Sequence, residues 1–260
     1  MNGLEIRELC MENLEDFIEL CIPPEKKNDP FFVEGIRAKK RWVHLVMEKY
    51  GSAGMIAYLN SRPAGMLQYL PNPEKKIVEI ECIFVPEKEN CRKGIGKALL
   101  KAFLEKIQNC REWFWDERPG GVITYAFSVP GRYPQYEFYK KMGFRQVSPD
   151  DPFLLYFPLA EKFVYTPEKY KPLEEDRNIA LVFYNPGCPF SIYFARKIRE
   201  LLVEVAPDLP IRMINQFEER EEVKKRGSVS FCIVNKKPIE TFFMDRENFQ
   251  REVREALGQQ

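Results

Sequence analysis

The hydrophobic residues of the first half of the chain recur at spacings that predict alternating strands and helices. Residues 4–9 alternate as in a short strand, and residues 11–21 follow with helical spacing. A second helix is predicted over residues 31–50, and Gly51 ends it. Two apolar runs then flank the turn segment "NSRP", which predicts a β-hairpin made of "GMIAYL" and "AGMLQYL".

The next predicted elements surround a turn that contains two glycines. An alternating strand, "KIVEIECIFV", leads into "CRKGIGKALLKAFLEKIQ", a helix whose apolar residues repeat every four positions: Ile95, Leu99, Phe103 and Ile107. A strand over residues 121–129, a short helix ending at Gly143 and two last strands, "FRQV" and "FLLYFPL", complete the pattern. We therefore expect residues 1–159 to form one domain that mixes helices and strands (α/β, of the α+β kind).

Residues 160–177 interrupt this pattern, because they are charged, contain two prolines and show no sustained period. They are predicted to form a linker. Residues 178–260 then follow the order strand, helix, strand, helix, two strands and helix, with the two consecutive strands at "VSFCIVN" and "IETFFM". About 80 residues suffice for a small independent core, so this block is predicted to be a second domain.

Charge and cysteine usage restrict the class of protein. The 260 residues include 40 lysines and arginines against 39 aspartates and glutamates, so neither nucleic acid nor a membrane is expected as a partner. No stretch has the roughly 18 apolar residues of a membrane span, and the N-terminal residues lack the apolar core of a signal peptide. Seven cysteines without a C-x-x-C pair indicate a reducing, cytoplasmic location. With a single histidine, no metal site is expected.

The segment "CRKGIGKALL" joins a strand directly to a helix, which is a general way to bind phosphate. The first N–H groups of a helix have no partner within the helix, and glycines at 94 and 96 leave the backbone accessible. Arg92, Lys93 and Lys97 add local positive charge. The alternative is an ordinary surface turn. The segment lacks the third glycine of the dinucleotide fingerprint and the Gly-Lys-Ser/Thr of a P-loop.

Together, "IECIFVPEKENCRKGIGKALL" and "FYKKMGF" resemble the acetyl-CoA-binding segments of the GNAT family of N-acetyltransferases, whose signature is Gln/Arg-x-x-Gly-x-Gly/Ala after a strand. The resemblance implies the GNAT fold, with a mixed, mostly antiparallel sheet. One position departs from the signature, because Cys91 stands where the family has Gln or Arg and Arg92 is displaced by one residue.

The same resemblance implies how acetyl-CoA is held as a co-substrate. Its carbonyl and pantetheine arm are expected to pair with the backbone of Ile83, Phe84 and Val85. Its pyrophosphate is expected on the turn and the start of the helix: Cys91, Arg92, Lys93, Gly94, Ile95, Gly96 and Lys97.

Acyl transfer to an amine needs a base for the amine and a proton for the departing thiolate. Alternation places Glu79 and Glu81 on one strand face with Ile83 and Val85, where a carboxylate could take the proton directly or through water. The family's strand glutamate matches Glu79 better. The alternative is that both carboxylates face solvent or pair with lysines.

Tyr139 in "FYKKMGF" matches the family's tyrosine that faces the CoA sulfur and can protonate the thiolate. Tyrosine is protonated at neutral pH, since its ordinary pKa is about 10, and so can act as a donor. The alternative is a packed aromatic residue beside Phe138. His44 lies between apolar neighbours in a predicted helix and is expected to be structural.

In the second block, "NPGCPFS" places Cys188 at a helix N-terminus, where the helix dipole lowers the pKa of a thiol. The order of elements resembles the thioredoxin fold, and Cys188 with Ser191 resembles its glutaredoxin-like C-x-x-S site. The whole arrangement resembles the YoaP-like group of GNAT proteins. Ser191 excludes dithiol exchange within the motif. Val229 stands where such proteins carry a cis-proline, and Cys232 is expected either to be buried or to partner Cys188.

We conclude from the sequence that the chain is an acetyl-CoA-dependent N-acetyltransferase in which a primary amine attacks the thioester directly. The acceptor is a small-molecule amine or an amine of a peptide or protein, which the sequence does not specify further. Two alternatives stay open. One is a non-catalytic acyl-CoA-binding sensor, and the other is a thiol redox or thiol-binding protein that acts through Cys188. The oligomeric state cannot be read from the sequence.

Overall fold

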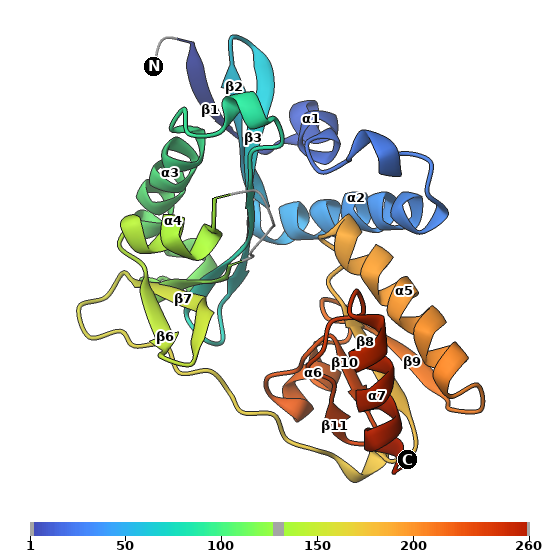
Figure 1. The fold of residues 1–260 in the computed structure, drawn as a ribbon. Helices are drawn as coiled ribbons and strands as arrows, with labels where there is room; N and C mark the ends of the chain where they lie inside the picture. The colour runs from blue at the N-terminus through green and yellow to red at the C-terminus, as the bar shows by residue number, and fades with distance from the viewer. Residues whose placement is uncertain (1–2, 127–132, 259–260) are drawn as a thin grey trace. The chain divides into compact units, whose positions relative to one another are not determined.

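The structure is a computed structural model that describes residues 3–126 and 133–258 (Figure 1). Its internal contacts divide the chain into two units, Met1–Ile22 with Val43–Thr166 and Pro23–Trp42 with Pro167–Gln260. The division falls inside helix α2 (Pro30–Tyr50). The predicted first domain, 1–159, includes residues 23–42, which in the structure pack with the second unit.

The first unit is built on a seven-stranded sheet in the order β1-β2-β3-β4-β5-β7-β6. Only β4 and β5 are parallel neighbours, and every other adjacent pair is antiparallel. The expected mixed, mostly antiparallel sheet is therefore confirmed. The strands are β1 (Leu4–Glu8), β2 (Gly54–Leu59), β3 (Arg62–Asn72), β4 (Ile77–Phe84), β5 (Gly121–Tyr125), β6 (Arg145–Ser148) and β7 (Asp151–Pro158).

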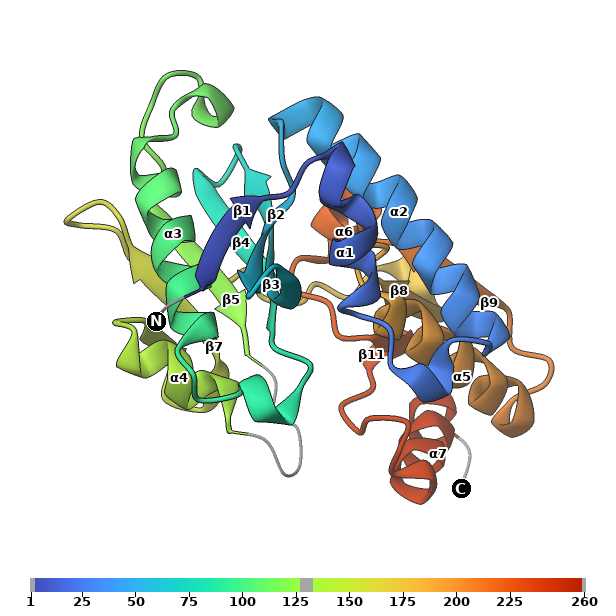
Figure 2. The same cartoon turned by 90° about the horizontal axis from the view of Figure 1, so that it is seen from above.

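Helices cover both faces of this sheet, with α3 on one face and α1 on the other (Figures 1 and 2). The apolar stripe predicted for α3 is buried in full, and Phe103 packs on Tyr69 of β3 with ring centroids 5.2 Å apart. On the α1 side, a Cβ at Gly54 would come within 2.6 Å of the Leu67 carbonyl oxygen and 2.8 Å of the Phe17 ring, so glycine leaves room for both the neighbouring strand and the helix. The helices of this unit besides the end of α2 are α1 (Leu14–Glu19), α3 (Ile95–Asn109) and α4 (Gln135–Lys141).

The second unit has a four-stranded sheet in the order β11-β10-β8-β9, in which β8 and β9 are parallel. Ala180 and Val182 of β8 face a core with α5 and α7, whereas Leu181 and Phe183 face the opposite core with Val223 of α6. The elements are β8 (Ala180–Tyr184), α5 (Pro189–Val205), β9 (Ile211–Asn215), α6 (Arg220–Arg226), β10 (Cys232–Val234), β11 (Lys237–Pro238) and α7 (Arg246–Leu257).

One predicted strand is wrong. The run "IETFFM", residues 239–244, is not a strand, and the returning strand is the short β11 just before it. Asn235 and Lys236 both have positive φ, which makes a two-residue turn and brings the chain straight back onto β10. The backbone N–H groups of Glu240 and Thr241 then donate to the Glu252 carboxylate instead of to a strand.

Another strand is shorter than predicted. The strand expected over residues 121–129 ends at Tyr125 in the structure. Residues 127–129 lie outside the described residues.

The predicted linker, residues 160–177, is divided between the two units after Thr166, and each part packs within its own unit. Phe163 lies over Gly120 and Gly121, where an added Cβ would come within 2.6 and 2.3 Å of its ring. Further along, the 3-10 turn Glu174–Asp176 brings the Asp176 carboxylate to Arg226, which donates from Nε at 2.9 Å and from Nη2 at 2.6 Å. These contacts explain why the segment has no regular hydrophobic period.

Candidate active site

Strand β4 carries an irregularity at the point where the sheet opens. Its register against β3 pairs Ile80 with Tyr69 and Cys82 with Gln68, which leaves Glu81 as an extra residue, a β-bulge. Pairing with β5 ends at Ile80, and the rest of β4 pairs with β3 alone in the described part of the chain. The edge of β4 after the bulge is therefore where another chain or a ligand can pair.

The bulge overturns the predicted common face of Glu79, Glu81, Ile83 and Val85. An inserted residue shifts the alternation by one, so positions before and after it change faces. Ile80 and Ile83, which strict alternation would place on opposite faces, are both buried, at 3% and 6% exposure.

Glu79 lies before the bulge and has a defined partner. Asn72 of β3 donates from Nδ2 to Glu79 Oε1 at 2.9 Å, which holds the partly buried carboxylate in one orientation. Glu79 stands opposite Leu70 on one side and Ile123 on the other. Glu81 is also partly buried, but it lies at the bulge itself.

Helix α4 covers the place where β4 and β5 separate. Tyr139 is 1% exposed, and its ring packs on Phe144 with centroids 4.9 Å apart. Burial raises the pKa of Tyr139 above its ordinary value, and a hydrogen bond with the Thr124 side chain acts in the opposite direction. Thr124 itself donates to the Ile80 carbonyl at 3.1 Å. The phenol therefore lies beside the last pair of the β4–β5 ladder.

Gln135, one turn before Tyr139 on α4, is a site residue that the sequence analysis did not single out. Its Nε2 donates to the Ile83 carbonyl at 3.0 Å, which is one of the backbone groups expected to meet the pantetheine arm. The signal that could have found it is its spacing, since positions i and i+4 share a helix face.

The glycine turn has the backbone geometry that the phosphate prediction needs. Gly94 is the N-cap of α3 with φ 76°, in the left-handed region that glycine tolerates, and it has no side chain to cap the first helical N–H groups. Gly96 is helical, and an added Cβ would meet Phe138 at 3.6 Å and Ile83 at 3.9 Å, which are ordinary contacts. The fold alone does not require glycine at 96, so backbone access is the better reason for it.

The remaining residues of the turn are placed as follows. Arg92, Lys93 and Lys97 are exposed, and they surround the start of α3 with positive charge. Ile95 is buried in the core. The exposed Cys91 donates from Sγ to the Glu87 carbonyl at 3.5 Å, so it steadies the loop before the turn.

These pieces form one site in the first unit. The neighbours of Gly96 are Phe138, from α4, and Ile83, from β4, so the glycine turn, the open strand edge and α4 meet there. The arrangement can hold an anion at the start of α3 and an extended chain along β4, with the Tyr139 phenol nearby.

The predicted thiol site lies in the second unit. Cys188 is the partly buried N-cap of α5, with Pro189 in the first helical position. Ser191 Oγ accepts from the Asn185 backbone N–H at 2.9 Å, so Ser191 stabilises the turn before the helix. Cys232 is fully buried in the core, and burial raises its pKa, which makes it unreactive. None of the seven cysteines, all of which lie among the described residues, forms a disulfide.

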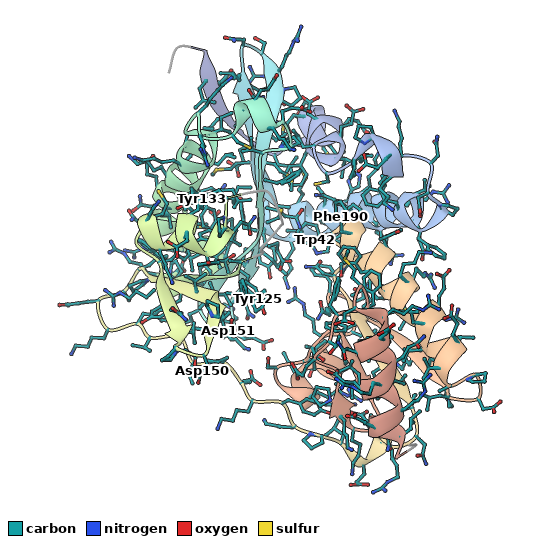
Figure 3. All side chains as sticks on the ribbon, viewed as in Figure 1. Trp42, Tyr125, Tyr133, Asp150, Asp151 and Phe190 are labelled. Atoms are coloured by element: carbon teal, nitrogen blue, oxygen red, sulfur yellow. The ribbon has the colours of Figure 1, made fainter. Side chains whose placement is uncertain are left out.

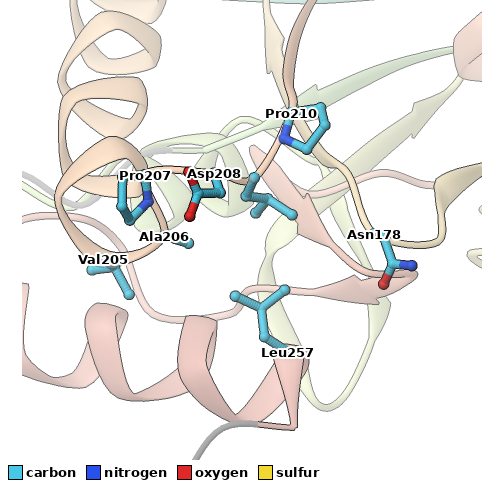
Figure 4. Close-up of a pocket in the computed structure, with 8 residues that line it drawn as sticks. Asn178, Val205, Ala206, Pro207, Asp208, Pro210 and Leu257 are labelled. Carbon is cyan, nitrogen blue, oxygen red and sulfur yellow. The ribbon is translucent and has the colours of Figure 1, made fainter.

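A hollow in the second unit is lined by none of the predicted site residues (Figure 4). It lies between the end of α5, the turn at residues 206–210 and the end of α7, with Asp208 as its one charged side chain. Among the described residues, no helix combines the length and apolar character needed to cross a bilayer.

Comparison with known proteins gives one family match. The sequence model of the Acetyltransferase (GNAT) family matches residues 14–144. No curated protein matches the chain.

Solved structures also match the chain in part. A PaiA N-acetyltransferase from Thermoplasma acidophilum in complex with coenzyme A is 21% identical, with 60% of this chain and 98% of that chain covered and a TM-score of 0.44. A GNAT acetyltransferase from Staphylococcus aureus Mu50 is 18% identical, with 60% and 99% covered and a TM-score of 0.45.

Proposed function

Because the chain belongs to the acetyltransferase (GNAT) family, we propose that it transfers the acetyl group of acetyl-CoA to a primary amine by direct attack of the amine. The observation that carries the proposal is the glycine turn beside the open edge of β4. Gly94 is required by its backbone conformation, whereas Gly96 is not, and both leave the first N–H groups of α3 accessible.

The residues of this site fit acetyl-CoA at both ends. The N–H groups at the start of α3, with Arg92, Lys93 and Lys97 around them, would hold the pyrophosphate, and hydrogen bonds to charged groups contribute roughly 1.5–3 kcal/mol each. The backbone of residues 83–85, beyond the last β5 pair, would hold the pantetheine arm. Gln135 already occupies the Ile83 carbonyl, so it would have to share or leave that acceptor.

We assign the two proton transfers to Glu79 and Tyr139. Glu79, oriented by Asn72, takes a proton from the nitrogen of the attacking amine, directly or through water. Tyr139 gives its phenolic proton to the CoA thiolate as the carbon–sulfur bond breaks. The raised pKa of Tyr139 supports this role, because the phenol stays protonated at neutral pH. Glu81, at the bulge, is the less favoured base.

The second unit supports a proposal of its own, that it is a thioredoxin-like domain of the YoaP-like kind. Its strands follow the order β9-β8-β10-β11, with β8 and β9 parallel and the remaining pairs antiparallel, and its helices follow β8, β9 and β11. We propose no thiol chemistry for Cys188. The amine acceptor and the cytoplasmic location stay predictions from the sequence.

Acetyl-CoA binding, measured by calorimetry, tests the proposed function. In Gly96→Glu, a carboxylate at the start of α3 should weaken binding by about a hundredfold or more, because it removes the room for the pyrophosphate and repels it. Gly96→Ala should keep the fold, since its Cβ meets only ordinary contacts, and bind several-fold more weakly.

Gln108→Glu is the matched control, because it adds the same charge at an exposed position near the other end of α3. It should bind acetyl-CoA as the wild type does. A folded wild-type protein that does not bind acetyl-CoA, or a Gly96→Glu variant that binds it unchanged, would refute the proposal.

A further inference from the structure

The second unit includes a segment that the sequence assigns to the acetyltransferase. Residues 23–42 lie within the 14–144 match to the family, yet they pack with Pro167–Gln260. Figure 3 marks one residue on each side of this packing, Trp42 on α2 and Phe190 at the start of α5. The contacts fall on the first turns of α5, after Cys188, and on the residues that follow β9.

The closest approach is between two backbones. A Cβ at Gly35 would come within 2.8 Å of both Cα and O of Pro189, the residue after Cys188. A glycine inside a helix lowers stability by roughly 0.5–1 kcal/mol relative to alanine, so the presence of Gly35 inside α2 calls for a reason. Contact with the first turn of α5 is that reason, because backbone atoms cannot move aside as a side chain can.

Aromatic side chains enclose this contact. Phe32 is fully buried and meets Phe190 edge to face, with ring centroids 5.0 Å apart. Lys26 donates from Nζ to the Tyr193 hydroxyl at 2.9 Å and lies 4.2 Å from the centre of its ring. The contact between the segment and α5 thus combines the buried Phe32–Phe190 pair with a hydrogen bond from Lys26 to Tyr193.

A charged pair fixes the direction in which the segment lies. Arg196 donates from Nε to Glu34 Oε2 at 3.0 Å and from Nη2 to Glu34 Oε1, a two-pronged contact. Pro189, Tyr193 and Arg196 are spaced by four and three residues, so they form one face of α5.

The other end of the segment is held as well. Trp42 packs on Phe217 with ring centroids 6.1 Å apart, and Arg41 pairs with Glu218 at 3.1 Å. Both partners follow directly after β9, well away in sequence from α5. The segment is therefore held at two separate places on the second unit.

We propose that the surface of the second unit next to Cys188 is a docking site for residues 23–42 of the same chain, and that the unit acts by holding this segment. An external protein that exchanged thiols with Cys188 would need the same surface, so it would have to displace the segment. The inference goes beyond the proposed acetyl transfer and rests on different residues.

Hydrogen exchange on the full chain, followed by mass spectrometry, tests the docking. In Gly35→Leu the side chain has no space against Pro189, so we expect exchange across residues 30–42 to accelerate about ten- to a hundredfold. Arg37→Leu is the control, because it places the same side chain at an exposed position of the same helix, and its exchange should match the wild type.

A charge exchange separates docking from general damage. Glu34→Arg and Arg196→Glu should each raise the hydrogen-exchange rate of residues 30–42 a few-fold. The double variant should return this rate to the wild-type value, because the ion pair can form again with its two charges exchanged. In Gly35→Leu, Cys188 should also react faster with iodoacetamide, as followed on its own peptide. A folded Gly35→Leu protein with unchanged exchange, or a double variant that restores nothing, would overturn the inference.

Acetyl-CoA calorimetry on the same variants keeps the two proposals apart. If none of the proteins binds acetyl-CoA while the charge exchange still restores protection, the docking stands and the acetyltransferase assignment of the first unit fails. If an external thiol-containing peptide binds at wild-type Cys188 with residues 23–42 released, the docking role is refuted.

Discussion

Tyr139 combines almost complete burial with a hydroxyl placed at the end of the β4–β5 ladder. We expect Tyr139→Phe to lower kcat by roughly a hundredfold, the low end of general acid catalysis, while acetyl-CoA binding is unchanged. Because burial raises its pKa, the wild-type donor should not limit activity up to about pH 10. Release of CoA with an accepted amine, measured against pH, checks both expectations.

Thr124→Val is the control for this experiment, because it removes the hydrogen-bond partner of Tyr139 and keeps the phenol and the shape of the site. It should retain most of the turnover. Unchanged turnover in Tyr139→Phe would assign the residue to packing alone, the alternative that the sequence left open.

Single residues also show the limit of the sequence analysis. Gly94 could be singled out because a glycine between a strand and a helix leaves the backbone accessible, and the structure adds that its φ of 76° lies in the left-handed region. The spacing of Gln135 from Tyr139 shows only that the two residues share a helix face, and its contact with the Ile83 carbonyl depends on how α4 lies on the sheet. A contact across elements leaves no periodic signal in one of them.

At the scale of elements, the bulge in β4 favours Glu79 over Glu81 as the proposed base. Glu79 lies in regular strand with Asn72 holding it, whereas Glu81 is the inserted residue. We expect Glu79→Gln to lower kcat/KM by about a hundredfold, since the glutamine cannot accept a proton from the amine. Glu81→Gln should change kcat/KM less than tenfold. A loss of less than tenfold in both variants would point to water as the base.

The bulge itself was beyond prediction. The alternation of polar and apolar residues ends at Glu81, and the apolar run from Cys82 to Val85 does not show which face each side chain takes after the inserted residue. The helix α3, in contrast, could be predicted to its buried stripe, because a long amphipathic period survives whatever it packs against. The run "IETFFM" was apolar enough for a strand, but the tight turn at Asn235 and Lys236 places the strand before it.

At the scale of the whole molecule, the two units divide after Thr166, within the predicted linker, and residues 23–42 belong to the second unit, which the sequence analysis did not predict. The apolar residues of α2 recur at helical spacing along its length, and that period is the same whether Phe32 packs on one core or another. Only the contacts of Gly35 with Pro189 and of Trp42 with Phe217 show which unit residues 23–42 join. A sequence pattern predicts that one face of a helix is buried, but only the structure shows which element that face packs against.

The second unit is further held together by a buried ion pair that fixes the segment leading into it. Arg226 is 1% exposed and donates to both oxygens of Asp176, and its carbonyl accepts from the Lys171 N–H. Arg226→Met should lower the free energy of unfolding by about 3–5 kcal/mol, because it leaves the Asp176 carboxylate buried without its partner. Urea unfolding at neutral pH measures this loss, and an unchanged midpoint would contradict it.

The same cluster predicts how stability depends on pH. Hydrogen bonds from Lys225 and Arg226 lower the pKa of Glu222 to about 2, below its value in the unfolded chain, with burial acting in the opposite direction. The contribution of Glu222 to the free energy of unfolding is therefore complete above about pH 4.5 and is lost as the pH falls toward about 2. Glu222→Gln should make the fall in urea midpoint over this window shallower. Asp208→Asn serves as a control in the same unit, and an equal slope in both variants would show that Glu222 does not carry the acid sensitivity.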